Sequence, residues 1–231
     1  MKTIGLIGGL SWESSAEYYR LLNQEFQRRL GGYHSAPLLM YSFNLAEMEP
    51  LQRTGQWDKA AARMVKAAQQ LEQAGADFLL ISSNTMHITA PEVERNVSLP
   101  LLHIADATAE AIGKAGLKRV GLLGTAYTME KDFYKARLTR SNGLSLLVPQ
   151  KTDREIVHRI IYDELCFGKI LQTSKEEYLR VMRDLVRQGA EGIILGCTEI
   201  SLLIKEGDFD TPLFDTTAIH VSKAVEFALQ D

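Results

Sequence analysis

The stretch Lys2–Gly9, KTIGLIGG, returns 116 residues later as Lys118–Thr125, KRVGLLGT. Each copy is a short apolar run that ends in a tight turn, which is typical of a strand buried on both faces of a parallel sheet. Two further pairs follow in the same order and at nearly the same spacing: Gln73–Asp77 with Arg187–Glu191, and Leu99–Leu101 with Thr211–Leu213. The chain is therefore predicted to contain two copies of one strand–helix unit.

Short apolar runs alternate with longer amphipathic stretches along the whole chain, which predicts an α/β fold with parallel strands. The expected strands are Ile4–Ile7, Leu38–Ser42, Phe78–Ser82, Leu101–Ile104, Val120–Leu123, Leu144–Val148, Gly192–Leu195 and Leu213–Phe214. The expected helices are Ser14–Leu30, Gln56–Ala74, Ile104–Ala115, Thr128–Ser141, Lys175–Gln188 and Thr217–Gln230.

We expect two pseudo-symmetric halves, each a parallel-sheet three-layer α/β/α sandwich. The first half is expected to span residues 1–100 together with a C-terminal helix near 215–231, and the second to span 101–214. Ligands of open parallel sheets bind outside the carboxyl ends of the strands. An active site is therefore expected in a cleft between the two halves.

Composition argues against several classes of protein. The formal net charge is −3 with scattered Lys and Arg, so no nucleic-acid partner is expected. Apolar runs such as Phe78–Ile81 are too short to cross a membrane. The N-terminal apolar run meets Gly8 and Gly9 at once, so we expect a first strand of a cytoplasmic protein rather than a signal peptide. No metal-ligand spacing and no pyridoxal signature is present, so no metal or cofactor is expected.

Two strand ends carry an unusual density of reactive and polar groups. The first reads Ile81–His87, ISSNTMH, and the second reads Leu195–Ile200, LGCTEI. Ser83 and Cys197 are 114 residues apart, so the repeat makes them equivalent positions. A racemase removes the α-proton from one face of a carbon and returns a proton to the other. Two acid/base groups at equivalent positions of two facing halves suit that reaction.

A thiol suits this role because its unperturbed pKa is about 8.5. Cys197 precedes an expected helix start, where backbone N–H groups and the helix dipole favour a thiolate. Asn84, Thr85 and Thr198 offer donors at the same turns. They could hold a substrate α-carboxylate and the negative charge that develops on it.

These pieces resemble the aspartate/glutamate racemase superfamily, and most closely its enterobacterial broad-specificity and L-aspartate/glutamate members. The matching segments are Ile4–Ser14, Ser83–His87 and Gly196–Glu199, and the similarity covers essentially the whole chain. The resemblance implies a cofactor-independent racemase of aspartate, glutamate or a broader amino-acid set, with Glu199 among the substrate-binding residues. Together with the frequency of closed symmetry, it also implies a homodimer.

Ser83 departs from the family pattern, which has a cysteine at this position and so two catalytic thiols. A serine hydroxyl is a far weaker acid and is not a base unaided. Three interpretations stay open: an asymmetric racemase that favours one hand, an engineered replacement of cysteine or threonine, and a one-thiol reaction. The last fits a decarboxylase or isomerase of a small dicarboxylate. A non-catalytic protein that binds an acidic metabolite is a further hypothesis.

Several other residues have both a functional and a structural interpretation. Ser11, Thr125 and Thr128 could contact substrate, or they could cap helices. His87 could tune the site or close a hydrogen bond at the start of a helix. Cys166 is expected to be a buried helix residue rather than a reactive thiol or half of a disulfide.

The segment that follows the second expected strand contains Gln52 and Arg53, and we expect it to be a loop. In the resembled family this loop reads the substrate side chain. Arg53 would suit a carboxylate and Gln52 a wider range of groups. The family also has a lysine that reads the side-chain carboxylate, and Cys166 takes its place here. That difference weakens the expectation of strict aspartate specificity.

Overall fold

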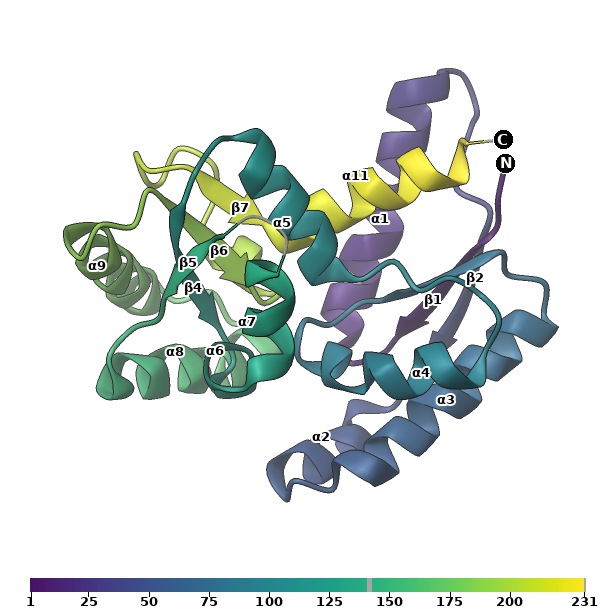
Figure 1. Ribbon diagram of the computed structural model, residues 1–231, viewed down its shortest axis with the longest axis horizontal. Coiled ribbons are helices and arrows are strands. Elements are labelled where there is room, and N and C mark those ends of the chain that lie inside the picture. The colour runs from purple at the N-terminus through teal and green to yellow at the C-terminus, as the bar shows by residue number, and fades with distance from the viewer. Residues whose placement is uncertain (141–142, 231) are drawn as a thin grey trace. The chain divides into compact units, whose positions relative to one another are not determined.

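The computed structural model describes residues 1–140 and 143–230. The chain divides into two compact units. Unit 1 comprises Met1–His103 and the segment from His220 onward, and unit 2 comprises Ile104–Ile219. Each unit is built on a parallel sheet with helices (Figure 1), which confirms the predicted α/β fold class. Within the described residues, no helix is both long and apolar enough to cross a membrane.

Unit 1 contains a three-stranded sheet in the order β2-β1-β3, all parallel. The strands are β1 (Ile4–Gly8), β2 (Leu38–Ser42) and β3 (Phe78–Ile81). The helices are α1 (Trp12–Leu30), α2 (Leu45–Arg53), α3 (Trp57–Gln73), the 3-10 helix η1 (Thr85–Thr89), α4 (Ala90–Asn96) and α11 (Thr216–Ala228), which enters unit 1 at His220.

Each face of this sheet has its own buried core, because successive strand side chains point to opposite faces. On one face, Ile4 and Leu6 pack with apolar residues of α1 and α11, which cover that face (Figure 1). On the other face, Leu79 and Ile81 pack with residues of α2, α3 and α4. Helices therefore cover both faces of the unit 1 sheet.

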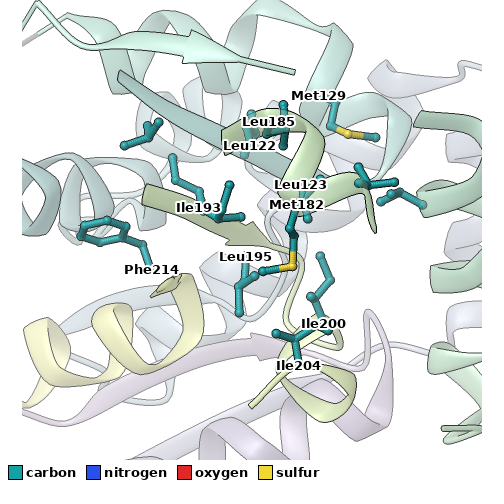
Figure 2. Close-up of a cluster of buried hydrophobic side chains, with 14 of the residues drawn as sticks. Leu122, Leu123, Met129, Met182, Leu185, Ile193, Leu195, Ile200, Ile204 and Phe214 are labelled. Atoms are coloured by element: carbon teal, nitrogen blue, oxygen red, sulfur yellow. The ribbon is translucent and has the colours of Figure 1, made fainter. Parts of the chain in front are cut away.

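Unit 2 contains a four-stranded parallel sheet in the order β5-β4-β6-β7. Its strands are β4 (Arg119–Gly124), β5 (Ser145–Leu147), β6 (Gly192–Gly196) and β7 (Leu213–Asp215). Its helices are α5 (Ile104–Lys114), α6 (Ala126–Glu130), α7 (Asp132–Thr139), α8 (Lys151–Asp163), η2 (Leu165–Phe167), α9 (Gln172–Arg187) and α10 (Ile200–Leu203). One continuous core fills the unit, and it includes Leu123, Ile193 and Leu195 of the central strands together with Met182 and Leu185 of α9 (Figure 2).

The sequence repeat is visible in matching contacts of the two units. Asp77 precedes β3, and its carboxylate accepts a hydrogen bond from the backbone N–H of Thr3 at 2.5 Å. Glu191 precedes β6 and accepts equivalently from Lys118 at 2.7 Å. In both cases an acidic residue caps the start of the central strand.

The helix that comes after the last repeated segment of each copy packs in the unit formed mainly by the other copy. α5 follows the first repeat, yet Ile104 and Ile112 belong to the core of unit 2. α11 ends the second repeat, yet Val221 and Val225 belong to the core of unit 1. Sequence order therefore does not coincide with the division into units.

A buried polar contact accompanies α11 in unit 1. The Tyr18 hydroxyl lies 2.8 Å from Nδ1 of His220, and Nε2 of His220 lies 2.9 Å from the carbonyl oxygen of Leu102. A carbonyl oxygen can only accept, so Nε2 carries the proton and Nδ1 accepts from the tyrosine. Both ring nitrogens of this fully buried histidine are thus satisfied in the neutral form.

We expect His220 to make stability fall with falling pH. Burial lowers its pKa from 6.5 to about 4. As the pH drops through 6.5 towards 4, the unfolded chain takes up a proton that the folded chain excludes, which costs about 3 kcal/mol. Urea unfolding at several pH values measures this slope. The neutral variant His220→Gln should have a flatter slope between these limits, and an equal slope in both proteins would contradict the assignment.

Some expected elements differ from those of the structure. The expected strand Leu101–Ile104 is only an isolated bridge between Leu101 and Leu79, because helix α5 begins at Ile104. The expected helix Thr128–Ser141 is instead two helices, α6 and α7, since Lys131 has an extended backbone; Ser141 lies outside the described residues. The helices α2, α4 and α8 were not predicted, and only the start of α10 was expected.

Candidate active site

The Cys197 turn joins β6 to α10 in unit 2. β6 ends at Gly196, where a Cβ atom would lie 2.6 Å from the carbonyl oxygen of Leu123, so only glycine fits against β4 here. The buried carboxylate of Glu199 accepts hydrogen bonds from Cys197 Sγ at 2.9 Å and from Thr198 Oγ1 at 2.8 Å. One carboxylate therefore organises the thiol and the hydroxyl of the turn.

The environment of Cys197 favours the protonated thiol. Burial raises the pKa of this thiol well above its ordinary value, and the negative charge of Glu199 raises it further. This corrects the expectation of a thiolate stabilised by a helix start. α10 has only four residues, and the charge of a whole carboxylate outweighs the partial charge at the end of so short a helix.

Replacing the charge of Glu199 tests this electrostatic description. In Glu199→Gln the amide still accepts from the turn but has no negative charge, so the pKa of Cys197 is expected to fall. The rate of Cys197 alkylation by iodoacetamide near neutral pH should rise severalfold, because the thiolate is the reacting form. Cys166→Ser in both proteins removes alkylation at the second thiol. An unchanged or slower rate would show that Glu199 does not hold the proton on sulfur.

Cys166 lies in η2, and its Sγ is 4.0 Å from Oε1 of Glu199. It was expected to be an unreactive buried residue, and the structure places it, half-buried, beside the carboxylate that contacts Cys197. Sequence reasoning missed this proximity because the two segments are far apart along the chain. The sequence offered one indication that Cys166 lies near the site: it takes the place of a lysine that reads the substrate side chain in the resembled family.

The Ser83 turn follows β3 in unit 1 and leads into η1. The half-buried Ser83 accepts a hydrogen bond at Oγ from the backbone N–H of Met86 at 3.3 Å. Its carbonyl oxygen lies 2.7 Å from Nδ1 of His87. Asn84 and Thr85 are both buried at the same turn. The structure therefore brings three of the predicted residues together at this strand end.

Small hydroxyl side chains connect this turn to the start of α1. Ser14 Oγ donates to the carbonyl oxygen of Ser82 at 2.9 Å, and Ser15 Oγ accepts from the N–H of Gly9 at 2.7 Å. Gly9 has a φ of 70°, and a Cβ there would lie 2.1 Å from the carbonyl oxygen of Phe43. This backbone conformation and this close approach both require glycine.

The capping interpretation is confirmed for two candidate residues. Ser11 is the N-cap of α1 and accepts from the N–H of Ser14 at 3.1 Å. Thr125 is the N-cap of α6 and accepts from the N–H of Thr128 at 3.3 Å. Both caps stand at the carboxyl ends of central strands. Contact with substrate stays a prediction for Ser11, Thr125 and Thr128.

Gln52 and Arg53 lie in the last turn of α2, not in a loop as expected. The buried Gln52 contacts Sδ of Met86 through Nε2 at 3.1 Å, which places it against the segment that follows Ser83. Arg53 is largely exposed and pairs with Glu49 at 3.2 Å. The role of either residue in reading a substrate side chain stays a prediction.

No three His, Cys, Asp or Glu side chains are grouped for a metal ion within residues 1–140 and 143–230.

The sequence profile of the Asp/Glu/hydantoin racemases matches residues 7–224. The chain belongs to the Asp/Glu/hydantoin racemase family. It is accordingly an isomerase of the amino-acid racemase type.

Solved structures and curated relatives agree with this family. A Yersinia pestis protein classed as an Asp/Glu racemase has 52% sequence identity, a TM-score of 0.92 and full coverage of both chains. An aspartate racemase homologue from Pyrococcus horikoshii has 39% identity, a TM-score of 0.85 and full coverage of both chains. The broad-specificity amino-acid racemase RacX of Bacillus subtilis is 24% identical over 168 residues, which cover 70% of this chain and 69% of that protein.

Proposed function

We propose that this racemase-family protein interconverts the two hands of aspartate, glutamate or a broader set of amino acids without a cofactor. Cys197 acts on one face of the α-carbon and Ser83 on the other. The observation that carries the proposal is the contact between Cys197 Sγ and the Glu199 carboxylate at a strand end of unit 2. That contact offers the thiol proton an acceptor at 2.9 Å.

The proposed reaction begins with proton transfer from Cys197 Sγ to Glu199. The resulting thiolate takes the α-proton, and its electron pair stays on the substrate as an enolate-like carbanion. Ser83 then donates its hydroxyl proton to the opposite face and regains a proton from solvent. Cys197 keeps the α-proton as its new thiol proton, and Glu199 releases to solvent the proton that it took from Cys197. Ser83 Oγ accepts from Met86 N–H, so its own O–H is the donor that faces the substrate in this scheme.

Polar groups at both turns support an amino acid as the substrate. Asn84, Thr85 and the backbone N–H of Thr198 are the proposed donors for the α-carboxylate, because the Thr198 hydroxyl already donates to Glu199. The negative charge of Glu199 favours an α-ammonium group beside it. Gln52 and Arg53 are proposed to select the side chain. With Cys166 in place of a lysine, we expect aspartate and glutamate to be accepted without strict selection.

A homodimer is part of the proposal and is tested by sedimentation.

Proton NMR in D2O with L- and D-aspartate and L- and D-glutamate tests the proposal. We expect the α-proton signal of one enantiomer to disappear much faster than that of the other, because neutral serine donates a proton but does not accept one. Loss of neither signal in a folded sample, across a wider amino-acid panel, would overturn the proposal.

A second candidate is a one-thiol decarboxylase or isomerase of a small dicarboxylate. Ser83 favours it, because this reaction needs only the Cys197 thiol. Release of carbon dioxide from a dicarboxylate, without deuterium uptake into any amino acid, would decide for the decarboxylase.

A further inference from the structure

The backbone of the Ser83 turn is held differently from that of the Cys197 turn. The carbonyl oxygen of Cys197 accepts from the backbone N–H of Ile200 at 3.1 Å, three residues on. The carbonyl oxygen of Ser83 instead lies 2.7 Å from the imidazole Nδ1 of His87. The carbonyl oxygens at these two equivalent positions thus have different donors, a main-chain N–H at Cys197 and a side chain at Ser83.

The His87 ring is itself held by its neighbours in unit 1. The side chain is 1% exposed, and its ring centroid lies 4.3 Å from that of His103 and 6.0 Å from that of His220. His220 is fixed by Tyr18 and by the carbonyl oxygen of Leu102. A carbonyl oxygen only accepts, so Nδ1 of His87 carries the proton in the Ser83 contact. The donor that meets Ser83 is therefore rigidly placed.

Holding the Ser83 carbonyl also orients the groups next to it. The peptide between Ser83 and Asn84 is planar, so its C=O and N–H point in opposite directions. With the carbonyl directed at His87, the N–H of Asn84 is directed to the other side of the turn. The same constraint limits the backbone rotation that carries Ser83 Oγ.

We propose that His87 is a positioning residue for Ser83, and that it sets how well the hydroxyl delivers its proton to the α-carbon. This inference rests on the proposed racemase function. His87 touches no reacting atom in this scheme. It acts through the backbone of Ser83, so its loss should impair the Ser83 face and leave the Cys197 face intact.

A matched pair of variants isolates the hydrogen bond. Asparagine and leucine have nearly the same shape, and only asparagine has an N–H that can take the place of Nδ1. His87→Asn and His87→Leu remove the same ring and leave the same space, so both share any loss of packing. Thermal unfolding should give similar midpoints for the two.

The experiment starts from the enantiomer that exchanges faster and measures how the carbanion is deuterated in D2O. Deuteration with retained configuration reports Cys197, and deuteration with inverted configuration reports Ser83. In His87→Leu the ratio of inverted to retained product should fall on the order of 10- to 100-fold, and the same fall is expected in Ser83→Ala. His87→Asn should keep the ratio within about threefold of the wild type.

Equal ratios in the Leu and Asn variants, or a parallel fall of both products in His87→Leu, would overturn the inference. If the wild type makes neither deuterated product, the proposed function fails instead. Calorimetric titration with L- and D-aspartate then decides about His87 alone: weaker binding in His87→Leu than in His87→Asn supports its positioning role at Asn84 N–H, and equal binding refutes it.

Discussion

Cys197→Ser is expected to slow α-proton exchange of the faster-exchanging enantiomer by about 1000-fold, which is within the usual contribution of a general acid/base. The serine hydroxyl can still donate to Glu199, so the turn should keep its hydrogen bond. What is lost is an atom that can become an anion near neutral pH and accept the α-proton. Exchange rates from proton NMR in D2O measure the effect.

Two controls separate chemistry from folding in this experiment. The midpoint of thermal unfolding should change little, and titration with aspartate should show binding within a few-fold of the wild type. Cys166→Ser serves as the matched thiol control, because it removes the other cysteine near Glu199 and should retain exchange. Normal exchange in Cys197→Ser would show that the base has been assigned to the wrong residue.

Ser83→Cys is expected to accelerate α-proton exchange of the slowly exchanging enantiomer by about 100-fold, again within the range for one acid/base group. A thiol with a pKa near 8.5 can take a proton as well as give one, whereas the serine hydroxyl cannot take one unaided. Ser83 is half-buried at the end of β3, so the larger sulfur should fit without rebuilding the turn.

Proton NMR in D2O, run separately on the L and the D enantiomer, measures this change. The two exchange rates should approach each other in Ser83→Cys. In the double variant Ser83→Cys, Cys197→Ser they should differ again, with the opposite enantiomer exchanging faster. If Ser83→Cys leaves both rates as they are, position 83 does not act on the α-carbon.

Much of the fold could be predicted because its signals are local. Buried parallel strands are short apolar runs, and the spacing of two such runs with their turns made Ser83 and Cys197 equivalent before any coordinates were known. Helix caps at Ser11 and Thr125 were foreseen as one of two interpretations. The helix α2 was missed because its nine residues include Pro50, a residue that usually signals a break.

The sequence by itself determined the α/β class, the twofold repeat and the two strand-end motifs, because these depend on the order of neighbouring residues. Only the tertiary structure decided that His87, His103 and His220 meet. It also decided that burial and the charge of Glu199 raise the pKa of the Cys197 thiol. The reason is physical: desolvation and charge act through space, and the groups that produce them here are set by packing rather than by spacing along the chain.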